Sequence, residues 1–144
     1  MNPVVRSVLA VIVGMLVAFV LIALVQTIGM RVYPPPSGLD VRDTESLKAM
    51  MAQIPLGALL FVLLAYAAGS VAGGWVAARL SPGSRMMHAM IVGGLLLGAG
   101  LMNLMTIPHP VWFWIASNPI YLLGAWSGAQ AAGAESEAPR PKPA

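Results

Sequence analysis

Cysteine is absent from this chain of 144 residues, and its absence excludes disulfide bonds, thiolate metal sites and cysteine nucleophiles. Charge is almost as scarce, because Asp, Glu, Lys and Arg together make up 9% of the residues, whereas soluble domains contain about 25%. Apolar residues account for 58% of the chain, and its mean hydropathy is +0.81. This balance predicts an integral membrane protein whose main solvent is lipid.

Acidic residues are missing from every long apolar run of the sequence. Acid–base catalysis and proton coupling inside a membrane require an ionisable side chain at depth. No serine has an evident base beside it, and no glycine-rich phosphate loop follows a strand. We therefore expect no enzymatic activity, no catalytic residue and no cofactor. The acids lie in one loop and in the C-terminal tail: Asp40, Asp43, Glu45, Glu135 and Glu137.

Long uncharged runs predict four transmembrane helices, at about residues 7–30, 54–80, 87–107 and 111–131. The first run gives roughly 36 Å of helix, enough to cross a hydrocarbon core of roughly 30 Å. It is longer than the apolar region of a signal peptide, so we expect it to be retained. The predicted fold class is all-α, a polytopic four-helix membrane bundle. Residues 1–131 form one domain, and residues 132–144, rich in Ala, Pro and charge, form a disordered tail.

A polar segment separates the first two predicted spans. Asp40 or Asp43 can cap a helix there. Leu47, Met50, Met51 and Ile54 then recur at i, i+3, i+4 and i+7, the spacing of a one-faced apolar helix. The pattern predicts a short amphipathic helix over about residues 43–53, lying on the membrane surface.

The same region carries a likeness to known sequences. It begins Tyr33-Pro34-Pro35-Pro36-Ser37-Gly38-Leu39-Asp40 and continues through the short helix into a Gly- and Ala-rich span. Over residues 33–80 it resembles small uncharacterised four-span bacterial membrane proteins. The resemblance implies a bacterial origin and four spans, and it implies no activity.

Small residues recur four positions apart within the predicted spans, and in lipid such spacing lets helices approach one another closely. The second span is the richest in them, so we expect it at the centre of the bundle, with Leu64, Val71 and Trp75 facing lipid. Pro119 predicts a kink in the fourth span near Asn118. The predicted helix-packing residues are Gly69, Gly73, Gly74, Gly94, Gly98, Gly124 and Gly128.

A polar cluster is the first candidate site. Its members are Gln26, Tyr66, Asn103, Thr106 and Asn118, drawn from all four predicted spans. They can form a solute or lipid-headgroup pocket. They can equally be interhelical hydrogen bonds, each worth roughly 0.6 kcal/mol in a membrane. The second interpretation is favoured, because no ionisable residue joins them.

Histidine and methionine form the second candidate site. Met86, Met87, His88 and Met90 gather at one end of the third span, and Met102, Met105 and His109 at the other. Thioethers and imidazole suit Cu(I). A helix holds the two histidines roughly 30 Å apart, however, and methionine commonly fills gaps in apolar contacts. We therefore expect no metal site.

Basic residues at the ends of the runs indicate orientation. Five basic residues fall on the side of the termini, and three on the side of the long loop. The positive-inside rule then places both termini in the cytoplasm, with the protein in the bacterial inner membrane. The basic residues form no patch, so no nucleic-acid partner is expected. The two sets are Arg6, Arg79, Arg85, Arg140 and Lys142, against Arg31, Arg42 and Lys48.

Three functions remain compatible with these features. The leading hypothesis is a structural or accessory protein that packs against another copy of itself or a membrane partner, because small-residue stripes exceed what four helices need for one another. The alternatives are a small oligomeric transporter or channel, and a lipid-binding sensor whose Leu47, Met50 and Met51 dip into the outer leaflet. Membrane lipid is an expected partner in each case.

Overall fold

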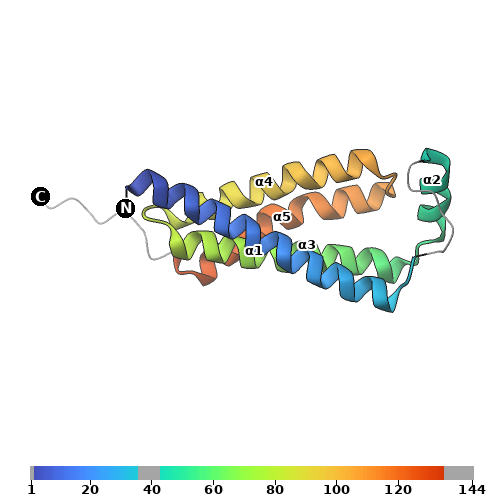
Figure 1. The fold of residues 1–144 in the computed structure, drawn as a ribbon, viewed down its shortest axis with the longest axis horizontal. Coiled ribbons are helices and arrows are strands. Elements are labelled where there is room, and N and C mark those ends of the chain that lie inside the picture. Colours follow the sequence, from blue (N-terminus) through green and yellow to red (C-terminus); the bar gives the residue numbers. More distant parts are fainter. Residues whose placement is uncertain (1, 36–42, 135–144) are drawn as a thin grey trace, which may run out of the picture.

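The computed structural model describes residues 2–35 and 43–134. This part of the chain is all-α, as predicted, and contains no strand. Four helices run lengthwise as a bundle, while a short helix lies across one end (Figure 1). The helices are α1 (Pro3–Val32), α2 (Thr44–Gln53), α3 (Leu56–Leu80), α4 (Arg85–Thr106) and α5 (Val111–Ala131).

Three of the described helices, α1, α3 and α4, are long and apolar enough to cross a membrane. This finding supports the prediction of a membrane protein with transmembrane helices. The fourth predicted span corresponds to α5, which is not among the three although it lies against α3 and α4. α1 contains 30 residues, or roughly 45 Å of helix, so it exceeds the thickness of the hydrocarbon core.

α3 is the central helix: it packs against α1, α4 and α5, and its interfaces with α1 and α5 are the two most extensive in the bundle. Its small residues make this possible: glycine, alanine and serine positions are buried around most of its circumference. The remaining stripe carries Leu64, Val71 and Trp75, whose exposed fractions are 56%, 38% and 40%. The residues predicted to face lipid therefore lie on the outside of the bundle.

Backbone meets backbone where α3 crosses α1 and α5. A Cβ atom added at Gly73 would lie 2.7 Å from the carbonyl oxygen of Gly14, and one added at Gly74 would lie 2.6 Å from that of Ala125. Both distances are below those that real Cβ atoms show, and a backbone obstacle cannot rotate away. Gly69, Gly124 and Gly128 lie in the same two interfaces, against α1 or α3.

Gly94 and Gly98 were predicted to pack against another helix, but in the described chain they contact none. No atom lies within 4 Å of the position that a Cβ would take at either residue, and both are exposed on α4. α4 instead turns Gly93 toward Ala125 and Gly100 toward the ring of Tyr121. The shift arises because the buried face of α4 passes through positions 93, 96 and 100, a quarter-turn or more away from positions 94 and 98.

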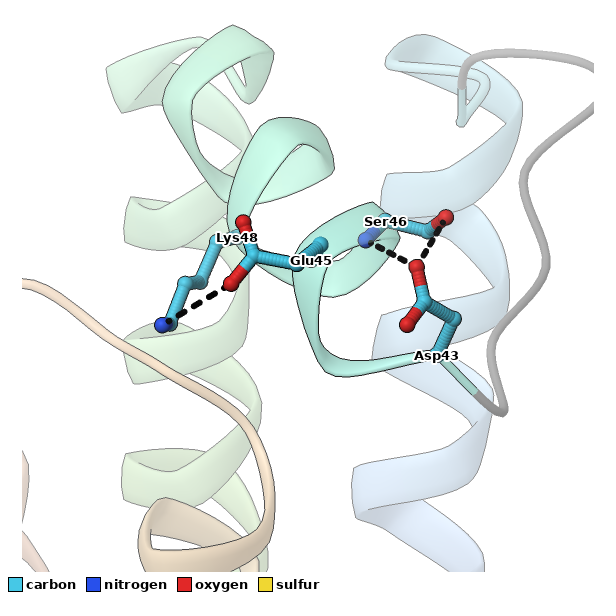
Figure 2. A network of polar contacts seen from close by, with 4 residues as sticks. All are labelled: Asp43, Glu45, Ser46 and Lys48. Atoms are coloured by element: carbon cyan, nitrogen blue, oxygen red, sulfur yellow. Dashed lines mark hydrogen bonds and ion pairs between the residues drawn. The ribbon is translucent and has the colours of Figure 1, made fainter.

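α2 begins close to its predicted start, and its first turn shows why (Figure 2). The carboxylate of Asp43 accepts hydrogen bonds from the backbone N–H and the hydroxyl of Ser46, both at 2.9 Å. These bonds lower the pKa of Asp43. Glu45 and Lys48 form an exposed ion pair at 3.4 Å on the same helix, of the kind that adds little stability.

The end of the bundle extends beyond its predicted limit. Ala132 is buried, and the guanidinium of Arg85 donates hydrogen bonds to the carbonyl oxygens of Ala132 and Gly133 at 3.1 and 3.3 Å. Gly133 takes a φ of 86°, which ends the helix in the left-handed conformation that glycine tolerates. The predicted tail therefore starts too early at 132, and residues 135–144 lie outside the described part of the chain.

Replacing a glycine by alanine at two positions of the bundle distinguishes a glycine needed for close helix packing from one that is not. Gly74→Ala places a methyl group against the α5 backbone, so we expect a loss of about 1–3 kcal/mol in the free energy of unfolding. Gly94→Ala meets open space, so we expect a gain of about 0.5–1 kcal/mol from the better helix former. Thermal unfolding of both variants in mild detergent tests this, and equal effects would contradict it.

Candidate ligand cavity

A cavity of about 340 Å³ lies at the end of the bundle crossed by α2, and we name it the α2-end cavity. α1 meets α4 near Gly14 and Val92, but the two helices draw apart toward α2 (Figure 1). Its walls come from both helices, from α2 and α3, and from the short segments between helices. It is lined by Gln26, Gly29, Met30, Tyr33, Pro34, Pro35, Met50, Met51, Gln53, Ile54, Pro55, Ala58, Leu59, Phe61, Val62, Tyr66, Asn103, Ile107 and His109.

The cavity brings together three of the five residues in the predicted polar cluster: Gln26, Tyr66 and Asn103. The amide nitrogen of Asn103 donates to the hydroxyl of Tyr66 at 3.3 Å, which links α4 to α3. Gln26 is half-buried on α1 and makes no hydrogen bond to any residue in the described ranges. An amide left without a partner near hydrocarbon is costly, so Gln26 is available to a ligand.

Thr106 and Asn118 do not line the cavity. Thr106 is exposed, and its hydroxyl donates to the carbonyl of Met102, one turn back on its own helix. The side-chain nitrogen of Asn118 donates to the carbonyl of Trp114 at 2.7 Å. This bond lies just before Pro119, where the helix lacks a backbone donor. The polar pattern in the sequence cannot distinguish such local bonds from groups that point into a shared space.

His109 also lines the cavity, although it was not part of the predicted polar cluster. Its Nδ1 lies 2.9 Å from the carbonyl oxygen of Ile107, and its ring stacks on Phe113 with centroids 4.8 Å apart. A carbonyl oxygen only accepts, so Nδ1 carries the proton and Nε2 of the neutral ring keeps its lone pair. Burial lowers the pKa of His109, and the bond to Ile107 opposes this only in part.

The sequence held a weak signal for His109. Pro108 and Pro110 flank it, and they restrict the turn between α4 and α5. The turn alone does not say that the ring faces α2 rather than water. Tyr33 and Gln53 also line the cavity, from the segment after α1 and the end of α2, whose docking no local pattern specifies.

An aromatic cluster packs behind Tyr66, the member of the cluster that lines the cavity. Phe113 is fully buried, and its ring contacts Tyr66 edge-on at 6.4 Å. Tyr66 in turn lies 5.0 Å from the ring of Tyr121, which occupies the space left open by Gly100. These rings hold α3, α4 and α5 together at this depth, so the cavity has a rigid base.

Charge is missing from the described lining of the cavity, which contains no Asp, Glu, Lys or Arg. Its polar atoms belong to amides, phenols and one imidazole, while its walls are mostly aliphatic and aromatic. Such a site suits a small ligand that is largely apolar with a few hydrogen-bonding atoms. Within the described ranges, no three His, Asp or Glu residues come together as a metal site would require.

The opposite end of the bundle, where α1 begins and α5 ends, uses its polar residues for structure. The guanidinium of Arg6 donates to the carbonyl of Leu80, the last residue of α3, at 3.2 Å, and Arg85 closes the end of α5. Cations at these C-termini compensate the helix dipoles. His88 is buried, and its Nδ1 lies within 2.9 Å of Ser81 and Ser84. It therefore serves the turn between α3 and α4.

Comparison of this chain with protein-family models, with curated proteins and with solved structures finds no match.

The protonation of His109 is directly measurable. Burial favours the neutral ring, so we expect its titration midpoint to fall below 6.5, the ordinary value for histidine. The ring is then neutral at pH 7 and gains a proton only under acidic conditions. Two-dimensional NMR of the imidazole groups in detergent micelles tests this, and a His109→Gln variant assigns the signal. A midpoint above 6.5 would contradict the buried position.

Proposed function

We propose that this protein is a four-span inner-membrane protein that binds a membrane amphiphile in the α2-end cavity. The observation that carries the proposal is the cavity itself: about 340 Å³ of space, lined by residues of four helices and partly open, apolar in its walls and polar at a few defined atoms. Ligand pockets have volumes of roughly 300–1,000 Å³. The cavity therefore suits a headgroup and the first part of a chain whose remainder lies in lipid.

Membrane insertion of α5 is part of the proposal. α5 has 21 residues, or roughly 32 Å of helix, and none of them is charged. Its outward residues are apolar: Ile115 is 71% exposed and Leu123 is 62% exposed. Because α5 lies along α3 and α4, and because these surfaces suit lipid better than water, a fourth span is supported.

Orientation follows from the basic residues at the two ends. Arg6 and Arg85 lie at the end where α1 begins and α5 ends, and Arg79 lies in the last turn of α3 at that end. The α2 end carries Arg31 and Lys48. The difference supports cytoplasmic termini, with α2 and its cavity facing the outer leaflet.

A lipid ligand is favoured over a water-soluble solute by the position of α2. Met50, Met51 and Ile54 line the cavity, while Glu45 and Lys48 remain on its exposed side. A helix with one apolar face and one charged face lies at the surface of a membrane. The cavity beneath such a helix is at the depth of lipid headgroups and upper chains.

Filling the cavity tests this proposal. Ala58 lines it, so Ala58→Trp occupies the space and should reduce co-purified lipid about tenfold or more, equivalent to about 1.4 kcal/mol of binding. Ala23→Trp makes the same change on an exposed position of α1 outside the lining and should leave retention unchanged. Native mass spectrometry of both proteins from bacterial membranes gives the readout. Equal retention by both variants would overturn the proposal.

Self-association through α4 is a second candidate function, favoured by one observation. Gly94 and Gly98 are four positions apart and meet nothing in the described chain, and exposed Ile91, Leu95 and Met102 flank them. Two glycines so placed allow a second helix to approach the backbone. The hypothesis of a structural protein that packs against itself therefore has a defined surface.

The absence of native cysteine makes this surface easy to test. Leu95→Cys should give a disulfide-linked dimer when membranes are oxidised, because a glycine crossing brings the neighbouring positions within disulfide range. Adding Gly94→Leu and Gly98→Leu should reduce the dimer at least about tenfold, by keeping the helices apart. Leu123→Cys, on the exposed face of α5, is the control. Equal crosslinking at both sites would count against a specific interface.

A further inference from the structure

The polar atoms of the α2-end cavity are not all used by the protein. Asn103 is bonded to Tyr66, and the amide nitrogen of Gln53 donates to the carbonyl of Ala49 at 3.3 Å. By contrast, His109 uses only Nδ1, in its bond to Ile107, and Gln26 uses neither of its polar atoms within the described chain. An imidazole lone pair and a whole amide therefore remain for a ligand. The side-chain oxygens of Gln53 and Asn103 and the hydroxyl of Tyr33 also line the cavity without a hydrogen bond in the described ranges.

We propose that the cavity selects an uncharged amphiphile with a free hydroxyl group, which donates its hydrogen bond to Nε2 of His109 and accepts one from the amide of Gln26. This inference rests on the proposed amphiphile binding and specifies its ligand class. Long-chain isoprenoid alcohols and diacylglycerols share the required chemistry, a neutral hydroxyl head on a long apolar chain.

The uncharged head follows from the lining. A phosphate or an ammonium group loses its hydration on burial, and an opposite charge or several strong hydrogen bonds must replace it. No described lining residue supplies such a charge. Arg6 and Arg85 lie at the other end of the bundle, where they already bond to helix carbonyls. Arg31 and Lys48 lie at the α2 end but outside the lining, and Lys48 is paired with Glu45. The cavity therefore discriminates against charged lipids.

The fixed tautomer of His109 is the reason why the ligand must donate a hydrogen bond, as a hydroxyl group can. Because the Ile107 carbonyl holds the proton on Nδ1, Nε2 of the neutral ring accepts and cannot donate. Stacking on Phe113 fixes the plane of the ring. A ketone or an ester head places an acceptor against this acceptor, whereas a hydroxyl completes the bond. Gln26, on the facing helix, adds a donor and a second acceptor.

The chain of the ligand has a defined way out. α1 and α4 separate toward the α2 end (Figure 1), and the cavity is lined from both sides of this separation, by Met30 on α1 and by Asn103 on α4. In a bilayer that separation faces hydrocarbon, so the head can sit under α2 while the chain extends sideways into lipid.

Matched photoreactive probes test the inference. The protein is reconstituted in phosphatidylcholine nanodiscs with a diazirine-bearing isoprenoid alcohol, its methyl ether or its monophosphate, and labelling at the cavity residues Met50, Met51 and Val62 is quantified by peptide mass spectrometry. A diacylglycerol and its methyl ether, carrying the same diazirine, form a second set. The alcohol should label about three- to tenfold more than the ether, since one hydrogen bond is lost, and more than the monophosphate.

Variants locate the effect. His109→Phe preserves the ring on Phe113 but removes Nε2, so labelling by the alcohol should fall to the level of the ether, while labelling by the ether stays unchanged and shows that the cavity is intact. Gln26→Leu should lower labelling by the alcohol in the same way from the opposite wall. Thr106→Ala, which lies outside the lining, should change nothing.

The outcomes separate this inference from the proposed function. Equal labelling by alcohol and ether, or stronger labelling by the monophosphate, would overturn the hydroxyl ligand and leave amphiphile binding in place. No labelling of the cavity by any probe would overturn both. Preference for one of the two alcohols over the other supports the inference and identifies the source of the hydroxyl.

Discussion

Close contact between helix backbones is the constraint on which this structure depends. α3 approaches α1 at Gly73 and Gly14, and approaches α5 at Gly74 and Ala125, at distances that leave no room for a Cβ. In lipid, where apolar side chains gain nothing by leaving the solvent, van der Waals contact of this kind holds helices together. The bundle therefore uses its glycines where a soluble protein would use large apolar side chains.

The same contacts generate the cavity. α1 is held against α3 from Gly14 to Gly29, which lies against Phe61, and it meets α4 near Gly14 and Val92. Following α3 carries α1 away from α4 at the α2 end (Figure 1). The resulting space is covered by α2 and bounded by Tyr66 of α3, whose ring packs on Phe113 of α5. The cavity thus arises from the geometry that stabilises the fold.

Sequence reasoning succeeded where the cause was local. The apolar runs gave the long helices, Asp43 capped α2 as a side-chain oxygen should, and the small residues of α3 indicated its central place. It succeeded less well for the site. Gln26, Tyr66 and Asn103 meet at the cavity, whereas the Thr106 hydroxyl and the Asn118 amide nitrogen donate to carbonyls of their own helices. Oδ1 of Asn118 is buried without a hydrogen-bond partner among the described residues. The side chain of a serine, threonine or asparagine in a helix can bond to a carbonyl of its own helix or face a neighbouring helix, and the packing of its neighbours decides which.

Composition and periodicity by themselves determined that this chain is helical, that its long helices suit lipid, and that these long helices contain no carboxylate or thiol side chain. Tertiary structure alone decided which face of α4 is buried, so that Gly93 and Gly100 touch α5 while Gly94 and Gly98 remain uncovered. It alone decided that His109 lines the α2-end cavity with one ring nitrogen unbonded within the described ranges. The physical reason is that hydropathy and backbone propensity act within a few residues, whereas the rotation of a helix and the position of a turn depend on side chains distant in sequence.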